Sequence, residues 1–311
     1  MMVGNNLKMK KMKKIILFPL FLAFILTACY DEYQTDYDFT AAYFSYQYPV
    51  RTVVIDPTVD KLEIQVGAAY GGKYSYEGTS ATLDFTIDET LITTNSDAIA
   101  KGIKVMPKSW YTLSDESKIN ITNSNVGFVN VTIKRDSLVK YPAAAVNTYA
   151  IPFKLTGAST DTILPAKNFS IVIVKFKNEF DGRYYVKGTD KTLNVEGAVV
   201  SSAVYSNTSL VLNKYIYLTT LKKDMLMVPR VGVSEDGTKF RYNLQYRSSD
   251  GKGILSADPA SNVTLLVGAA QYNFAKKSFV CSYNYKYNNI EHSVVDTLIY
   301  SNTEFKIESW K

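Results

Sequence analysis

The sequence predicts an all-β protein made of two domains, and three observations lead to this prediction. The 311 residues exceed the usual length of one domain. Many short segments alternate apolar and polar side chains with a period of two, and turns rich in Gly, Asn and Asp separate them. No sustained helical period is present, and only residues 91–100 could form a short helix. We therefore expect an immunoglobulin-like β-sandwich over residues 41–178 and a second β domain over residues 179–311.

The first 28 residues have the pattern of a lipoprotein signal peptide. Lysines precede an apolar run of twelve residues, 15–26, and Thr27 and Ala28 follow it before Cys29. Twelve residues span about 18 Å as a helix, which is too short for a hydrocarbon core of about 30 Å. Residues 26–29, Leu-Thr-Ala-Cys, resemble the bacterial lipobox, whose cysteine becomes the lipid-bearing first residue of the mature protein. Cys29 is therefore the predicted lipid-attachment site, and acyl chains there would hold the protein on a membrane.

Residues 29–40 carry four acidic side chains and no basic one, which indicates a solvated tether. Acidic residues directly behind a lipid-bearing cysteine resemble the signal that directs Bacteroidetes lipoproteins to the outer face of the outer membrane. The resemblance implies a lipid-anchored protein of the cell outer membrane that faces the exterior.

The strands of the first domain are predicted from the alternation of side chains. Clear examples are residues 62–66, 83–87, 119–121 and 128–134. Such segments are typical of antiparallel strands with one buried face. Residues 169–176 are apolar on both faces and are predicted to form a central strand.

The second domain continues this pattern. Strands are predicted at residues 183–187, 209–218, 225–228, 240–246, 263–267, 278–287, 293–300 and 304–307. Consecutive strands with short turns fit either an up-and-down barrel or a second sandwich. Asp236 and Gly237 are predicted to form a tight hairpin turn.

Several segments together resemble one family of surface lipoproteins. They are residues 83–92, 105–113, 149–155, 178–188 and 274–285. The family belongs to the polysaccharide-utilisation systems of Bacteroidetes, and its N-terminal domain, of unknown function, also precedes some endoglycosidase catalytic domains. The resemblance implies a lipocalin-like antiparallel barrel over residues 179–311. It further implies a polysaccharide or oligosaccharide ligand and an outer-membrane transporter complex as a partner. The family has no catalytic signature, so no functional residue is carried over.

Composition and motifs exclude several kinds of chemistry. Five lysines and no acid precede residue 29, which leaves 30 basic and 29 acidic side chains and no basic excess for nucleic acid. His292 is the single histidine, and its predicted place at a hairpin end favours a surface or capping role over catalysis. The sequence has no zinc-ligand set, calcium loop or nucleotide-binding glycine motif. We therefore predict no catalytic residue, metal or cofactor, and a buried apolar role for Cys281.

The 24 tyrosines are the remaining indication of function, because Tyr and Trp offer a sugar an apolar face and a hydrogen-bonding edge. One stripe lies on a single face of a strand and is predicted to pack in a core: Tyr283, Tyr285 and Tyr287. Trp110 lies in a segment typical of packing, so a core role and a ligand contact both remain open. Tyr74 and Tyr76 lie in a loop bordered by glycines, where ligand contact is an alternative to simple exposure.

Two functions remain compatible with the sequence. The first is a non-catalytic cell-surface lipoprotein that binds glycan in a polysaccharide-utilisation system, with Tyr74, Tyr76 and Trp110 as candidate ligand contacts. The alternative is a structural or adhesion component of the outer surface that binds protein partners.

Overall fold

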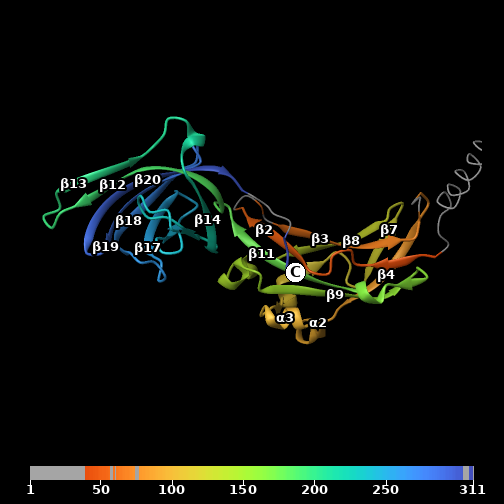
Figure 1. The fold of residues 1–311 in the computed structure, drawn as a ribbon. Helices are drawn as coiled ribbons and strands as arrows, with labels where there is room; N and C mark the ends of the chain where they lie inside the picture. Colours follow the sequence, from red (N-terminus) through yellow and green to blue (C-terminus); the bar gives the residue numbers. More distant parts are fainter. Residues whose placement is uncertain (1–38, 57–58, 60, 74–76, 304–307, 311) are drawn as a thin grey trace, which may run out of the picture.

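Two β-rich bodies follow each other along the chain (Figure 1). The computed structural model describes residues 39–56, 59, 61–73, 77–303 and 308–310. The first body is a sandwich of two sheets and the second is a closed barrel, so the predicted all-β fold is confirmed. Cys29, and with it the predicted signal peptide and most of the tether, lies outside the described residues.

The sandwich contains two mixed sheets. The first has the order β10 (Thr162–Ile163), β1 (Ala41–Tyr43), β3 (Leu62–Gly71), β8 (Val126–Ile133) and β6 (Tyr111–Leu113). The second has the order β21 (Glu308–Ser309), β2 (Pro49–Ile55), β11 (Phe169–Asn178), β9 (Tyr149–Ala158), β4 (Ser80–Ile87) and β7 (Lys118–Thr122), and β5 (Lys104–Val105) pairs with β9. The pairs β1–β10, β2–β11 and β5–β9 are parallel, which differs from the antiparallel pairing expected from alternation alone.

Strand β11 is central, as its apolar sequence predicted. It lies between β2 and β9, and its side chains enter two different cores. Val172, Val174 and Phe176 point into the space between the two sheets. Ile171 and Ile173 pack on the other face, beneath the short helices α2 (Thr90–Thr94) and α3 (Ser96–Ala100). These helices cover residues 90–100 and so match the predicted helical segment 91–100 to within one residue, and they cover one face of the second sheet.

The barrel closes because its first and last strands pair with each other. Its order is β12 (Gly182–Leu193), β14 (Tyr215–Lys222), β15 (Met225–Val228), β16 (Tyr242–Tyr246), β17 (Lys252–Ala257), β18 (Thr264–Asn273), β19 (Ser278–Tyr287) and β20 (Ile290–Asn302). These eight described strands are antiparallel, and the pairing of β12 with β20 closes the sheet, which shows a barrel and not a second sandwich. Strand β13 (Val199–Tyr205) pairs with the far half of β12 and extends the hairpin beyond the barrel (Figure 1).

The described C-terminal residues leave the barrel and return to the sandwich. Strand β21 pairs with Pro49 and Val50 of β2, and the buried indole of Trp310 joins the core beneath β11. Residues 308–310 therefore differ from the predicted barrel assignment of 179–311, because the burial of Trp310 and the pairing of β21 with β2 hold them on the sandwich. No helix in the described ranges has the length and apolar character needed to cross a membrane.

Candidate functional site

A hydrogen-bond network fixes the junction between the sandwich and the barrel. The Asp181 carboxylate, which is buried, accepts hydrogen bonds from the backbone N–H and the hydroxyl of Thr220, both at 2.8 Å. The Thr220 hydroxyl oxygen in turn accepts from the backbone N–H of Asn178 at 2.9 Å. A Cβ on Gly182 would lie 2.7 Å from the carbonyl oxygen of Asn302, so only glycine allows this close approach. The network ties the end of β11 to β14 and positions the groups on both sides of the junction.

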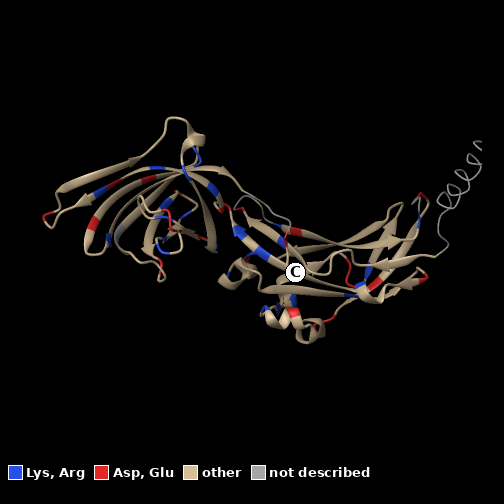
Figure 2. Cartoon of the chain, in the orientation of Figure 1, with Lys and Arg blue, Asp and Glu red and all other residues tan. Residues whose placement is uncertain are grey.

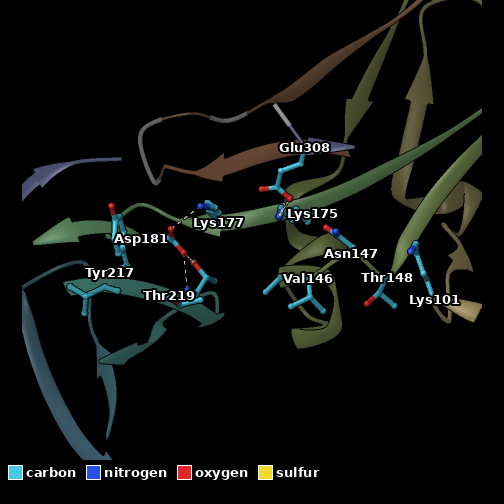
Figure 3. A pocket seen from close by; sticks show the side chains of 14 residues that line it. Lys101, Val146, Asn147, Thr148, Lys175, Lys177, Asp181, Tyr217, Thr219 and Glu308 are labelled. Atoms are coloured by element: carbon cyan, nitrogen blue, oxygen red, sulfur yellow. Dashed lines mark hydrogen bonds and ion pairs between the residues drawn. The ribbon is translucent and has the colours of Figure 1, made fainter. Parts of the chain in front are cut away.

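A cleft of about 810 Å³ lies at this junction (Figure 3). The barrel contributes Tyr217 and Thr219 of β14, and the sandwich contributes Asn147 and Thr148 from the segment before β9. Within the described residues, the side chains of Asn147, Thr148 and Thr219 make no hydrogen bond to protein, so their amide and hydroxyl groups can bind a ligand. Such a wall of one aromatic ring and several neutral polar groups is typical of a site that recognises hydroxyl-rich ligands.

Two of the three lysines in the described lining of the cleft pair with its carboxylates. Lys175 pairs with Glu308 at 2.6 Å, and Lys177 pairs with Asp181 at 3.0 Å. The Lys101 ammonium lies 5.8 Å from the centre of the Trp310 ring. Figure 2 shows basic residues along the end of β11, with acidic and basic residues interspersed over both bodies. Because Lys175 and Lys177 are paired with carboxylates, most of the charge along the described cleft is compensated, which favours an uncharged ligand over an anion.

An exposed aromatic surface adjoins the cleft on the outside of the barrel. We call it the tyrosine face, and it consists of Arg183, Tyr185, Tyr215 and Tyr217. Tyr215 is 54% exposed and Tyr217 is 42% exposed, and their rings meet edge to face at 5.8 Å. The Arg183 guanidinium lies 5.4 Å from the centre of the Tyr215 ring and donates to the Ser301 hydroxyl at 3.1 Å. Because Tyr217 belongs to both, the tyrosine face and the cleft form one continuous surface.

The candidate ligand contacts predicted from the sequence are Tyr74, Tyr76 and Trp110. Tyr74 and Tyr76 lie outside the described residues. Trp110 is 7% exposed, stacked on Tyr141 at 4.7 Å and packed against Tyr149 at 5.0 Å. This is the core packing that the sequence left open for Trp110, and Trp110 does not line the cleft.

A second polar cluster lies inside the barrel around two buried aspartates. Asp190 accepts a hydrogen bond from the Tyr285 hydroxyl at 3.0 Å, and its other oxygen lies 2.8 Å from Nδ1 of His292. His292 stacks on Tyr285, with ring centres 4.5 Å apart, and its side chain is 17% exposed. His292 lies next to the turn between β19 and β20, as predicted, but its side chain is mostly buried against Asp190 and Tyr285 instead of lying on the surface. Closure of the barrel through the pairing of β12 with β20 brings Asp190 to the histidine.

Asp296 is the other centre of this cluster. It accepts hydrogen bonds from the hydroxyls of Tyr205 and Tyr283, and burial raises the pKa of its carboxyl to about 6. Tyr283 and Tyr285 belong to the barrel core, which confirms the predicted packing of the tyrosine stripe, and Cys281 is buried as predicted. Among the described residues, no three His, Cys, Asp or Glu side chains gather closely enough to hold a metal ion.

The pH dependence of stability is expected to depend on Glu179, at the junction. Burial, and to a lesser degree the charge of Asp56, raises the pKa of the Glu179 carboxyl from 4.5 to about 7. The folded state therefore binds this proton more tightly than the unfolded state does. The contribution of the protonated Glu179 carboxyl to the free energy of unfolding is complete below about pH 4.5. It is lost as the pH rises through about 7.

We expect the melting temperature to fall between pH 5.5 and pH 8, and Glu179→Gln to reduce that fall. Asp296, whose pKa is also raised, leaves a smaller slope in the variant. Thermal melts at four pH values would measure this. Equal slopes in the wild type and the variant would contradict the role of Glu179.

Comparison with known proteins places the chain in a fold class. A family model for an N-terminal domain matches residues 34–162, which contain most of the sandwich. A protein of unknown function from Bacteroides ovatus has a similar structure, with a TM-score of 0.68 and 20% identity over 88% of this chain and 98% of that chain. An auxiliary nutrient-binding protein from Bacteroides thetaiotaomicron matches with a TM-score of 0.42 and 12% identity, over 80% of this chain and 90% of that chain. No curated protein matches. The Bacteroides ovatus match, at this identity, supports a shared fold and no more.

Proposed function

We propose that the protein is a surface lipoprotein that binds a neutral polysaccharide without turnover, in the junction cleft and along the tyrosine face. The observation that carries this proposal is the continuity of two exposed tyrosines with a polar cleft in which most charged groups are paired. Tyrosine rings stack on the apolar faces of sugar rings, and the amide and hydroxyls of Asn147, Thr148 and Thr219 bind sugar hydroxyls. The cleft is open to solvent and continuous with an exposed aromatic surface. It can therefore hold a few sugar units of a long polysaccharide.

Binding without turnover is supported by the state of the two acids in the described lining of the cleft. A glycosidase needs one carboxyl group as an acid and a second as a base or nucleophile. The Asp181 carboxylate accepts hydrogen bonds from Thr220 and forms an ion pair with Lys177. The Glu308 carboxylate forms an ion pair with Lys175. Neither is available to a glycosidic oxygen without breaking an ion pair. We therefore expect no release of reducing ends from any polysaccharide that the protein binds.

We further propose that lipid on Cys29 holds the protein at the outer membrane, facing the exterior. Support comes from the leader sequence and from the acidic residues that follow it. Within a polysaccharide-utilisation system, the protein would present captured glycan to an outer-membrane transporter complex.

The replacement of Tyr215 and Tyr217 together by alanine is expected to weaken binding of neutral polysaccharide. Each ring contributes about 1 kcal/mol, so the loss of both raises Kd roughly thirtyfold. The melting temperature should change little, because both rings lie on the barrel surface. Affinity electrophoresis through gels that contain a panel of neutral plant and microbial polysaccharides would measure the change.

Phe39→Ala is the matched control, because Phe39 is a 60% exposed aromatic residue that does not line the cleft. Unchanged retention of the double variant would show that the tyrosine face is not the binding surface. If no neutral polysaccharide is retained at all, the alternative role as a structural or adhesion component becomes the better explanation. Exposed valines on the protruding strand β13, among them Val200 at 61% and Val204 at 69%, favour that alternative.

A further inference from the structure

A second groove, on the sandwich, combines two exposed aromatic rings with an arginine. It has a volume of about 650 Å³, and Glu308 is the one described residue that lines both this groove and the junction cleft. Tyr46 is 69% exposed and Phe128 is 53% exposed. Arg51 of β2 and Gln65 of β3 line the same groove. The groove therefore offers both apolar ring faces and strong hydrogen-bonding groups to a ligand.

The Phe128 ring is held flat by a glycine on the neighbouring strand. Gly67 pairs directly with Phe128, and a Cβ on Gly67 would lie 2.8 Å from Cε1 of the ring. The ring therefore lies against the backbone of β3, and its large exposed fraction is presented to solvent as a flat apolar surface. This packing explains how the ring is supported, and its outward surface remains available for contact with a ligand.

Arg51 is the uncompensated charge of this groove. Its Nε is buried without a hydrogen-bond partner, and Arg51 forms no ion pair within the described part of the chain. Glu308, the acid that lines the groove, pairs with Lys175 at 2.6 Å instead. A half-buried guanidinium without a counterion is unfavourable, and a carboxylate that accepts two of its hydrogen bonds relieves that cost.

We propose that this groove binds a polysaccharide that carries carboxylated sugars. The sugar carboxylate pairs with Arg51, and the apolar ring faces pack on Phe128 and Tyr46. Gln65 donates from Nε2 to Oδ1 of Asn130 at 3.1 Å, which leaves its carbonyl oxygen to accept from a sugar hydroxyl. The acidic ligand class follows from the charge of the groove, so this inference goes beyond the neutral ligand proposed for the cleft and does not depend on it.

The test compares polygalacturonate, alginate and fully methyl-esterified polygalacturonate, which keeps the sugar ring but lacks the carboxylate. We expect the protein to bind at least one of the two acidic polymers, and polygalacturonate more tightly than its ester, with affinity falling as salt is raised. Arg51→Gln should raise Kd for the acidic polymer about tenfold and remove most of the salt dependence. Phe128→Ala should weaken binding of the same polymer, because it removes the flat ring. Affinity electrophoresis and titration calorimetry on the purified full-length protein would give both quantities.

Arg247→Gln is the matched control, because Arg247 is a 70% exposed arginine on the barrel, outside the groove. It should leave the affinity unchanged. The absence of retention by both polygalacturonate and alginate, or equal affinity of Arg51→Gln and wild type, would overturn the proposal. The double replacement of Tyr215 and Tyr217 should preserve binding of the acidic polymer, so failure at one site is distinguishable from failure at the other.

Discussion

Phe279→Ala is expected to lower the free energy of unfolding of the barrel by about 3–5 kcal/mol. Phe279 is fully buried and lies at the centre of an aromatic cluster. Its ring centre is 4.6 Å from that of Tyr272 and 5.3 Å from that of Phe180. Alanine would leave a cavity among rigid rings that cannot collapse to fill it, and the lost contacts add to the lost burial.

This substitution also tests whether the sandwich and the barrel unfold independently. Two independent domains would give two calorimetric transitions, of which Phe279→Ala lowers only one. Phe274→Ala, in the turn between β18 and β19, is the control, because its side chain is 55% exposed and should change stability by no more than about 0.5 kcal/mol. A single transition that shifts as a whole would mean that the junction network around Asp181 and the return of β21 join the two bodies into one cooperative unit.

The fold class and most strands could be predicted from the sequence because each strand buries one face or two. In β3, β4 and β8 the apolar side chains of the alternating pattern are the ones that face the core. Strand β13 shows no such alternation, because nearly all its side chains are exposed on a hairpin beyond the barrel. The sequence pattern therefore does not predict this strand. The tight hairpin predicted at Asp236 and Gly237 is also wrong. The Asp236 carboxylate accepts from the N–H and hydroxyl of Thr238 within a long connection between β15 and β16, which is not a tight hairpin.

The candidate site could not be predicted, because its parts are brought together only by the tertiary structure. Asn147, Lys177, Thr219 and Glu308 lie in four distant segments, and no spacing or motif connects them. Their proximity depends on the junction network and on the return of the C-terminal strand to β2. The pairing of Asp190 with His292 is similar, since the two residues lie 102 positions apart and meet only when the barrel closes. A composition rich in tyrosine could indicate glycan binding, but could not show which rings are exposed.

Trp110→Ala is expected to destabilise the sandwich by about 3–5 kcal/mol while leaving glycan binding intact at temperatures where the variant is folded. The indole is buried between Tyr141 and Tyr149, and the backbone carbonyl of Trp110 accepts from the N–H of Lys134 at 2.7 Å. Removal of the ring opens a cavity against the sandwich core, to which Trp110 belongs. The sandwich transition in calorimetry should therefore move to lower temperature, and the barrel transition should stay in place if the two domains are independent.

Trp110→Phe separates the two roles that the sequence left open for this residue. Phenylalanine keeps most of the apolar contact with Tyr141 and Tyr149, so it should restore much of the stability lost in the alanine variant. It would not restore a specific ligand contact that needs the indole N–H. If both variants bind neutral polysaccharide as the wild type does, Trp110 acts through packing alone. A loss of affinity in the well-folded Trp110→Phe protein would instead make Trp110 a ligand contact, and would move the candidate site from the junction cleft to the sandwich surface beneath Tyr141.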